Sequence, residues 1–259
     1  MGKGGGLLAE STVGTITLAS NVFDGNSAEA FGGGAYAETE VGGQTILRKN
    51  TFINNTAHSS GGGARLRSVS GGTMTLTNNV FYSNSVMPTW QGEGGGATVT
   101  CGTGGTAILT NNTVVGNSAS GGLSGSAGGG IRLLLFTATG EAKAFIYNNI
   151  IWGNIADGAA DLWVQDGAVG PGGPPPIKPA VYLFNNDYSD FHIIWGDNLS
   201  EGNNIDADPL LSSSFHLQLG SPCIDTGTNG APGIPLTDFE NEPRIIDGDF
   251  DGSAVVDIG

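Results

Sequence analysis

The chain has 259 residues, of which 46 are glycine, and 24 acidic residues against 9 basic ones give a net charge of −15. This balance argues against nucleic acid and anionic membrane surfaces as partners, because both require a basic patch. No apolar run reaches the length of a transmembrane helix, so membrane insertion is not expected.

The two cysteines, Cys101 and Cys223, stand in unrelated parts of the sequence, and two free thiols are favoured over a disulfide. The first residues, Met1 to Lys3, lead directly into a repeat unit. This start predicts that the chain is part of a longer protein.

A repeat of about 28 residues organises the first part of the chain, and such periods indicate solenoid folds. It is marked by glycine triplets that begin at Gly4, Gly32, Gly61, Gly94 and Gly128. Asparagine pairs spaced by five residues accompany them, at Asn21/Asn26, Asn50/Asn55, Asn79/Asn84, Asn112/Asn117 and Asn149/Asn154.

Each unit also carries a large apolar residue two positions after its leading asparagine: Phe23, Phe52, Phe81, Val114 and Ile151. The flanking residues alternate with period 2, which is typical of short strands rather than helices. One unit cannot bury its apolar side alone, but stacked units can. The sequence therefore predicts an all-β, right-handed parallel β-helix with internal ladders of apolar residues and of asparagine.

The motif Phe-x-x-Asn, as in Phe23–Asn26, together with Gly-Gly-Ala, as in Gly33–Ala35, resembles the repeat of polymorphic outer-membrane proteins. More broadly the chain is similar to the pectin-lyase-like superfamily. Its end, from Phe215 through Asp225 to Gly259, resembles bacterial secreted proteins called choice-of-anchor Q proteins. The resemblance implies a β-helix that is secreted or exposed on a bacterial surface. It does not decide the function, because these families include adhesins, lyases and hydrolases.

In chain order, we expect β-helix coils over residues 4–208 and a non-repetitive tail over 209–259 that caps the open end. Longer connections fall at 87–93, at 119–127 and at the proline-rich insertion loop 166–180. The repeat resumes near Val181. Insertions that gather at one corner of a solenoid are typical of loops beside a binding face.

The strand after each glycine triplet supplies the candidate site. Alternation places residues such as Ala35 and Ala64 inside, so the residues between them should point to solvent in two columns. The candidate ligand-binding residues on these columns and in the neighbouring insertion are Tyr36, Arg65, Arg67, Trp90, Glu93, Arg132 and Trp163. Aromatic rings and forked arginine donors suit a carbohydrate ligand, although a plain solvated sheet face would look similar.

We therefore predict a secreted or surface-exposed module that binds a polysaccharide or another surface partner without catalysis. The alternative is an enzyme on the same fold. By its family resemblance a lyase could use Arg65 or Arg132 as the base, with Glu38, Glu93 or Asp161 holding Ca²⁺. A glycoside hydrolase would need a carboxylate pair such as Asp187 and Asp190. The histidines His58, His192 and His216 stand alone, and no role is expected for them.

A calcium site is also predicted in the tail. The run from Asp247 to Gly252 has aspartates at alternate positions, which suits the oxygen ligands of Ca²⁺. The run departs from an EF-hand loop, because its twelfth position is Ile258 rather than glutamate. The candidate ligands are Asp247, Asp249, Asp251 and Asp257.

Overall fold

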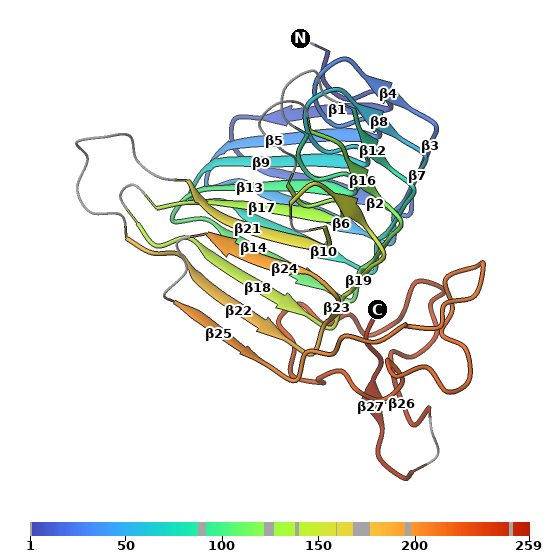
Figure 1. Cartoon of the computed structure of the whole chain (residues 1–259). Helices are drawn as coiled ribbons and strands as arrows, with labels where there is room; N and C mark the ends of the chain where they lie inside the picture. The colour runs from blue at the N-terminus through green and yellow to red at the C-terminus, as the bar shows by residue number, and fades with distance from the viewer. Residues whose placement is uncertain are drawn as a thin grey trace.

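The computed structural model describes residues 2–87, 92–121, 127–137, 140–158, 160–167, 177–194, 198–248 and 251–259. All elements among these residues are strands (Figure 1). With no helix in these ranges, none is available that could cross a membrane.

Most of the chain forms four parallel sheets, named sheets 1 to 4. Sheet 1 contains β1 (Leu7–Ser11), β5 (Ala35–Val41), β9 (Ala64–Ser70), β13 (Ala97–Thr103), β17 (Ile131–Phe136), β21 (Leu162–Gly167) and β24 (Phe191–Ile194). Sheet 2 contains β2 (Thr15–Ala19), β6 (Gln44–Arg48), β10 (Thr73–Thr77), β14 (Thr106–Thr110), β18 (Lys143–Tyr147), β22 (Ala180–Phe184) and β25 (Leu199–Gly202).

Sheets 3 and 4 are built from shorter strands. Sheet 3 contains β3 (Val22–Asp24), β7 (Thr51–Ile53), β11 (Val80–Tyr82), β15 (Thr113–Val115), β19 (Ile150–Trp152) and β23 (Asp187–Tyr188). Sheet 4 contains β4 (Ser27–Ala28), β8 (Thr56–Ala57), β12 (Ser85–Val86), β16 (Ser118–Ala119) and β20 (Ile155–Ala156). The first five coils contribute one strand to each of the four sheets, and the strands from β21 onward continue sheets 1 to 3 only. The predicted parallel solenoid is confirmed.

The glycine triplets are required where the chain turns into sheet 1. The first glycine of a triplet adopts a left-handed conformation, as in Gly32 with φ of 65°. The second lies against the next coil: a Cβ on Gly33 would come within 2.3 Å of the carbonyl oxygen of Gly62. A side chain at either position would therefore strain the backbone or push the coils apart.

Two kinds of internal ladder hold the coils together. Phe52 is fully buried and stacks on Phe23 and Phe81, with ring centroids 4.8 and 4.7 Å apart. The asparagines form the predicted hydrogen-bonded ladders, and Asn50 is representative. Its Nδ2 and its backbone N–H both donate to Oδ1 of Asn79, each at 3.0 Å. These contacts satisfy buried polar groups at each turn.

The tail packs on the side of the solenoid, over sheet 3. Its hydrogen bonds run from Asn185, whose Nδ2 donates to the carbonyl of Thr226, back to Asn78, which donates to that of Thr237. A second apolar cluster joins Ile150 of β19 to Cys223 and Ile258 of the tail. Within the described residues these contacts are lateral, and closure of the open end by the tail stays a prediction. The tail lacks the repeat, and apolar residues such as Ile258 pack on the outward face of sheet 3.

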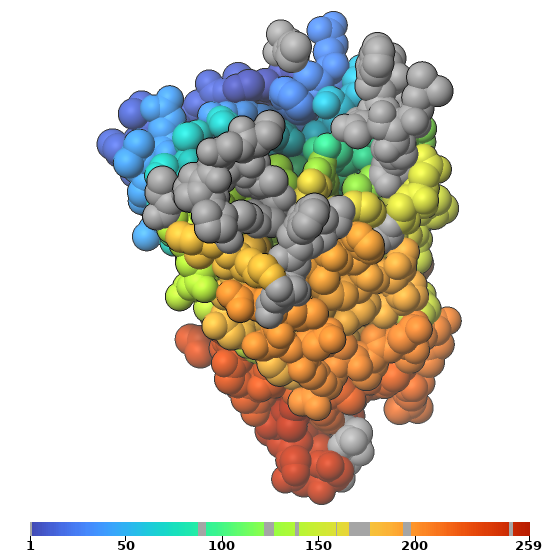
Figure 2. Space-filling view, turned by 60° about the vertical axis from the view of Figure 1, so that its left-hand side comes forward, coloured from blue at the N-terminus to red at the C-terminus, as the bar shows by residue number. Residues whose placement is uncertain are grey.

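The tail has little regular structure of its own. Its one described sheet is an antiparallel pair, β26 (Ile245–Ile246) with β27 (Val255–Val256). In Figure 2 the coils follow one another from blue to orange, and the red tail projects at the far end. Both cysteines are buried and free, as expected.

Candidate functional site

The predicted outward columns of sheet 1 are in register. Strand pairing aligns Tyr36 with Arg65, Arg65 with Thr98, Thr98 with Arg132 and Arg132 with Trp163. The neighbouring column contains Glu38, Arg67, Thr100 and Leu134. We call the residues of these two columns, with Lys3, Glu10 and Glu93, the strip.

The strip is less exposed than the alternation predicted. Tyr36, Thr98 and Arg132 are only 3%, 1% and 8% exposed. The cause is a further ladder formed by the residues just before each triplet: Lys3, Phe31, Ser60, Glu93 and Ala127. The left-handed glycine that follows turns the chain back beside its own strand. These residues therefore flank and partly cover the column.

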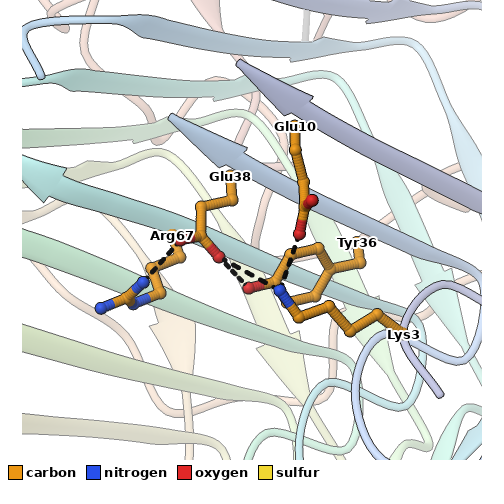
Figure 3. A network of polar contacts seen from close by, with 5 residues as sticks. All are labelled: Lys3, Glu10, Tyr36, Glu38 and Arg67. Carbon is orange, nitrogen blue, oxygen red and sulfur yellow. Dashed lines mark hydrogen bonds and ion pairs between the residues drawn. The ribbon is translucent and has the colours of Figure 1, made fainter. Parts of the chain in front are cut away.

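One end of the strip is a network of charged groups (Figure 3). The Nζ of Lys3 lies 2.7 Å from Glu10 and 4.5 Å from the centre of the Tyr36 ring. Glu38 accepts hydrogen bonds from the Tyr36 hydroxyl and from Arg67, the latter at 2.6 Å. Burial tends to raise the pKa of Glu38, but the Tyr36 hydrogen bond and the positive charges of Arg67 and Lys3 leave it lower than usual.

Arg65, at the centre of the described strip, is held by neutral groups. Its Nη1 donates to Oγ of Ser60, and its guanidinium lies 4.8 Å from the centre of the Phe31 ring. No carboxylate among the described residues forms an ion pair with it. Burial lowers its pKa. Within the part of the chain that the structure describes, Arg65 is thus a partly buried cation without a paired anion.

Arg132, two coils further on, is more enclosed. It pairs with Glu93, and its Nη2 donates to Oε1 of Gln165 at 2.7 Å. Among the described residues its Nε has no hydrogen-bond partner, and neither has Nε1 of Trp163 in the next coil. Burial, together with the positive charge of Arg65, lowers the pKa of Arg132 to about 10. Arg132 Nε and Trp163 Nε1 are both closed off from solvent, so a ligand could reach them only if neighbouring side chains moved.

The strip is locally basic. It holds four cations, Lys3, Arg65, Arg67 and Arg132, against the carboxylates of Glu10, Glu38 and Glu93. The whole chain carries −15. Negative groups on a ligand would therefore meet a more positive electrostatic potential here than on most of the surface.

Several other candidate residues have structural contacts. Asp161 is fully buried and ends the second asparagine ladder, because its Oδ1 accepts from the backbone N–H and Nδ2 of Asn154. Asp187 accepts from the backbone N–H of Ala207 and the Cys223 thiol. Asp190 accepts from the N–H of Ala160. These aspartates serve the fold and do not form a carboxylate pair open to a sugar.

Trp90 and Asp249 lie outside the described residues. For the predicted calcium loop, Asp247 accepts from the N–H groups of Asp251 and Gly252, which closes the turn. Asp257 instead accepts from the N–H of Asp225. Among the described residues no three His, Cys, Asp or Glu side chains gather as metal ligands would. Calcium at this loop stays a prediction.

Sequence reasoning missed part of the strip. His192 pairs in register with Trp163, and their rings lie 4.5 Å apart. Gln165, Ser60 and Phe31 also contact the strip's arginines. The flanking ladder had a readable signal, since its members occupy one fixed position before each triplet. His192 had none, because it follows an insertion that breaks the repeat.

The fold places the chain among parallel β-solenoid proteins. No family model, curated protein or solved structure matches it.

Proposed function

We propose that the chain is a binding module for a carbohydrate chain that lies across the strip of sheet 1. The observation that carries this proposal is Arg65, a partly buried arginine between Tyr36 and Thr98 in one column, with no carboxylate paired to it in the described ranges. A planar guanidinium donates in a fixed fork that suits sugar hydroxyls and carboxylates. Trp163 and His192 add rings at one end.

The location follows from the same proposal. The repeat resembles that of secreted bacterial β-helix proteins, and we infer a secreted or cell-surface module within the pectin-lyase-like superfamily. The parallel solenoid and the acidic composition support this inference. Separation of culture medium, surface extract and cell contents from the producing organism tests it, since recovery only in the cell contents would contradict it.

The test of binding is retention on immobilised neutral and acidic polysaccharides. Arg65→Gln should weaken retention about tenfold or more, because a hydrogen bond to a charged group contributes roughly 1.5–3 kcal/mol. Arg48→Gln is a matched control, since Arg48 is exposed on β6 of sheet 2 and its replacement changes the net charge equally. Equal weakening by both variants would show that only net charge matters and would overturn the assignment of the strip.

A polysaccharide lyase is the second candidate. It is favoured by the covered position of Arg132, which is 8% exposed, because burial eases loss of the proton that an arginine acting as a base must give up. Cleavage of uronate polymers would appear as absorbance of the unsaturated product, and Arg132→Gln would abolish it. Retention of the polymer without such absorbance supports the binding module instead.

A further inference from the structure

Two short hairpins of the tail meet beside sheet 3. One is closed by an antiparallel bridge between Leu211 and Leu217, and the other by a bridge between Thr237 and Pro243. Side chains from both hairpins line a cavity of about 390 Å³, whose opposite wall includes Val80 of sheet 3. The cavity lies on a different sheet from the strip, so a function of this cavity does not depend on the one proposed for the strip.

A serine, a histidine and a glutamate on these hairpins line the cavity and contact one another. Oγ of Ser214 lies 2.9 Å from Nδ1 of His216, and Nε2 of the same ring lies 2.9 Å from Oε2 of Glu240. A hydroxyl, a base and an orienting carboxylate within hydrogen-bond reach are the arrangement that activates a serine nucleophile. Either ring nitrogen of a neutral histidine can be the acceptor, so Nδ1 can act as the base here.

The hydrogen bonds of this cluster determine which atoms hold the protons. A carboxylate only accepts, so Nε2 of neutral His216 carries the proton and Nδ1 is left to accept from Ser214. The backbone N–H of His216 donates to Oγ of Ser212, whose own hydroxyl can then donate to Oγ of Ser214, 3.1 Å away. The Ser214 hydroxyl therefore points at the base, and a second donor stabilises the negative charge that develops on its oxygen.

Contacts with the solenoid hold both hairpins in place. Phe215, between the serine and the histidine, has a φ of 67°, which is strained for a residue with a large side chain. Its ring packs edge-on against Tyr82 of β11, with the centroids 5.1 Å apart. Lys49 donates to Thr237 Oγ1 and Asn241 Oδ1 of the other hairpin. Strained backbone that is held by its surroundings occurs often at functional sites.

The cluster is also accessible to a substrate. The side chains of His216 and Glu240 are each 56% exposed, and Ser214 is exposed as well. Within the described ranges the backbone N–H of Ser214 has no acceptor, so it can donate to an oxyanion that forms at Oγ. Phe215 and Phe239 give the cavity apolar surface for an acyl or alcohol group, and its volume is within the range of small-molecule sites.

We propose that Ser214, His216 and Glu240 form an esterase site. Oγ of Ser214 attacks the carbonyl carbon of the ester while its proton passes to Nδ1 of His216, and the Glu240 carboxylate stabilises the imidazolium. The tetrahedral intermediate expels the alkoxide, which takes the proton from Nδ1 and leaves as an alcohol. Water then attacks the acyl-serine as His216 takes its proton, and Oγ of Ser214 leaves with that proton. The net reaction converts ester and water into carboxylic acid and alcohol.

The experiment is hydrolysis of p-nitrophenyl acetate by the whole chain, followed by the absorbance of p-nitrophenolate. Ser214→Ala and His216→Ala should each lower kcat/KM about hundredfold or more, because the nucleophile and the base act as a unit. Glu240 positions the histidine without touching the substrate, so Glu240→Gln should lower kcat and leave KM unchanged. His58→Ala is the matched control, since His58 is exposed and lies outside the cavity lining; it should leave the rate unchanged.

Covalent labelling of the native chain removes the dependence on variants that fail to fold. A fluorophosphonate should modify Ser214, and mass spectrometry of the digested chain locates the adduct. The proposal is overturned if Ser214 stays unmodified, if Ser214→Ala keeps the native rate, or if His58→Ala lowers the rate as much as His216→Ala does.

Discussion

The inside of the solenoid and the strip on sheet 1 share one strand register, but their residue types follow different patterns from coil to coil. Inside, one residue type recurs from coil to coil, as in the stack of Phe23, Phe52 and Phe81. The asparagine ladders likewise use every donor they present to the next coil. Along the first column of the strip no residue type recurs in adjacent coils, since Tyr36, Arg65, Thr98, Arg132 and Trp163 follow one another.

This difference separates the residues that stabilise the fold from the residues that are available to bind a ligand. Stacking identical side chains satisfies each coil with its neighbours and leaves little for a ligand. On the strip, as far as the structure describes it, Arg65 has no paired carboxylate, and Arg132 Nε and Trp163 Nε1 have no acceptors. We therefore expect ligand binding where the residue types stop repeating from coil to coil. The main contribution to stability should come from the positions where they repeat.

The largest loss of stability should come from the phenylalanine stack. Phe52→Ala removes a fully buried ring between two others and should cost roughly 3–5 kcal/mol of unfolding free energy. Val22→Ala, at a position 72% exposed on β3, should change it little. Denaturant melts of the two variants measure the difference, and an unchanged melt for Phe52→Ala would contradict the importance of the stack.

The asparagine ladder should be nearly as sensitive. Asn84 donates to Asn117 Oδ1 and to the Phe52 carbonyl, and its Oδ1 accepts from Asn55. Asn84→Ala would leave several of these buried groups unpaired, at a cost of roughly 2–4 kcal/mol. Asn26→Ala removes a residue from the end of the same ladder, where fewer bonds are lost and water has access. Similar melts for both variants would show that the ladder does not act through buried hydrogen bonds.

The fold could be predicted because its causes are local and repeated. The position of Phe52 relative to Asn50 recurs in other coils, so one unit indicates the register of all. The role of Asp161 could not be predicted in this way. This residue takes the place of a ladder asparagine after an insertion has shifted the spacing, and only the structure reveals that its Oδ1 accepts from Asn154.

The site was predicted only in part, for a related physical reason. Alternation along β5 and β9 correctly aligned Tyr36 with Arg65. It could not show that Phe31 and Ser60 flank Arg65, because this contact depends on the path of the turn before the strand. The tail was harder still: it has no repeat, and its docking surface on sheet 3 is set by contacts distant in sequence.

A calcium ion in the tail would stabilise a region that lacks the repeating ladders of the solenoid. Asp247 and Asp251 lie in one turn of a chain that carries −15. Calcium that binds only the folded form should stabilise it by about 2.7 kcal/mol at a hundredfold excess over Kd. We expect a chelator to lower the melting temperature and Asp249→Ala to remove that sensitivity. Glu40→Ala, at an exposed position on β5, should retain it. A native chain that ignores the chelator would exclude the ion.

The smallest effect concerns Asp187, where the last strand of sheet 3 meets the tail. Its carboxyl group faces the Ala207 N–H, the Cys223 thiol and the charges of Asp206 and Asp161. Burial is the main cause that raises its pKa from 3.8 to about 6. The folded chain therefore holds this proton more tightly than the unfolded chain does. Between about pH 4 and pH 6 this carboxyl lowers the stability as the pH rises.

Asp187→Asn should remove this contribution, because the amide stays neutral and can still accept from the Ala207 N–H. We expect the variant to be more stable than the native chain by roughly 1–2 kcal/mol above pH 7 and to lose the advantage below pH 4. Asp24→Asn, at an exposed position on β3, provides the matched loss of one charge. Melting temperatures of the native chain and of the two variants, measured from pH 3.5 to 8, test this prediction. A constant difference between Asp187→Asn and the native chain over that range would mean that the Asp187 carboxyl does not titrate at the junction.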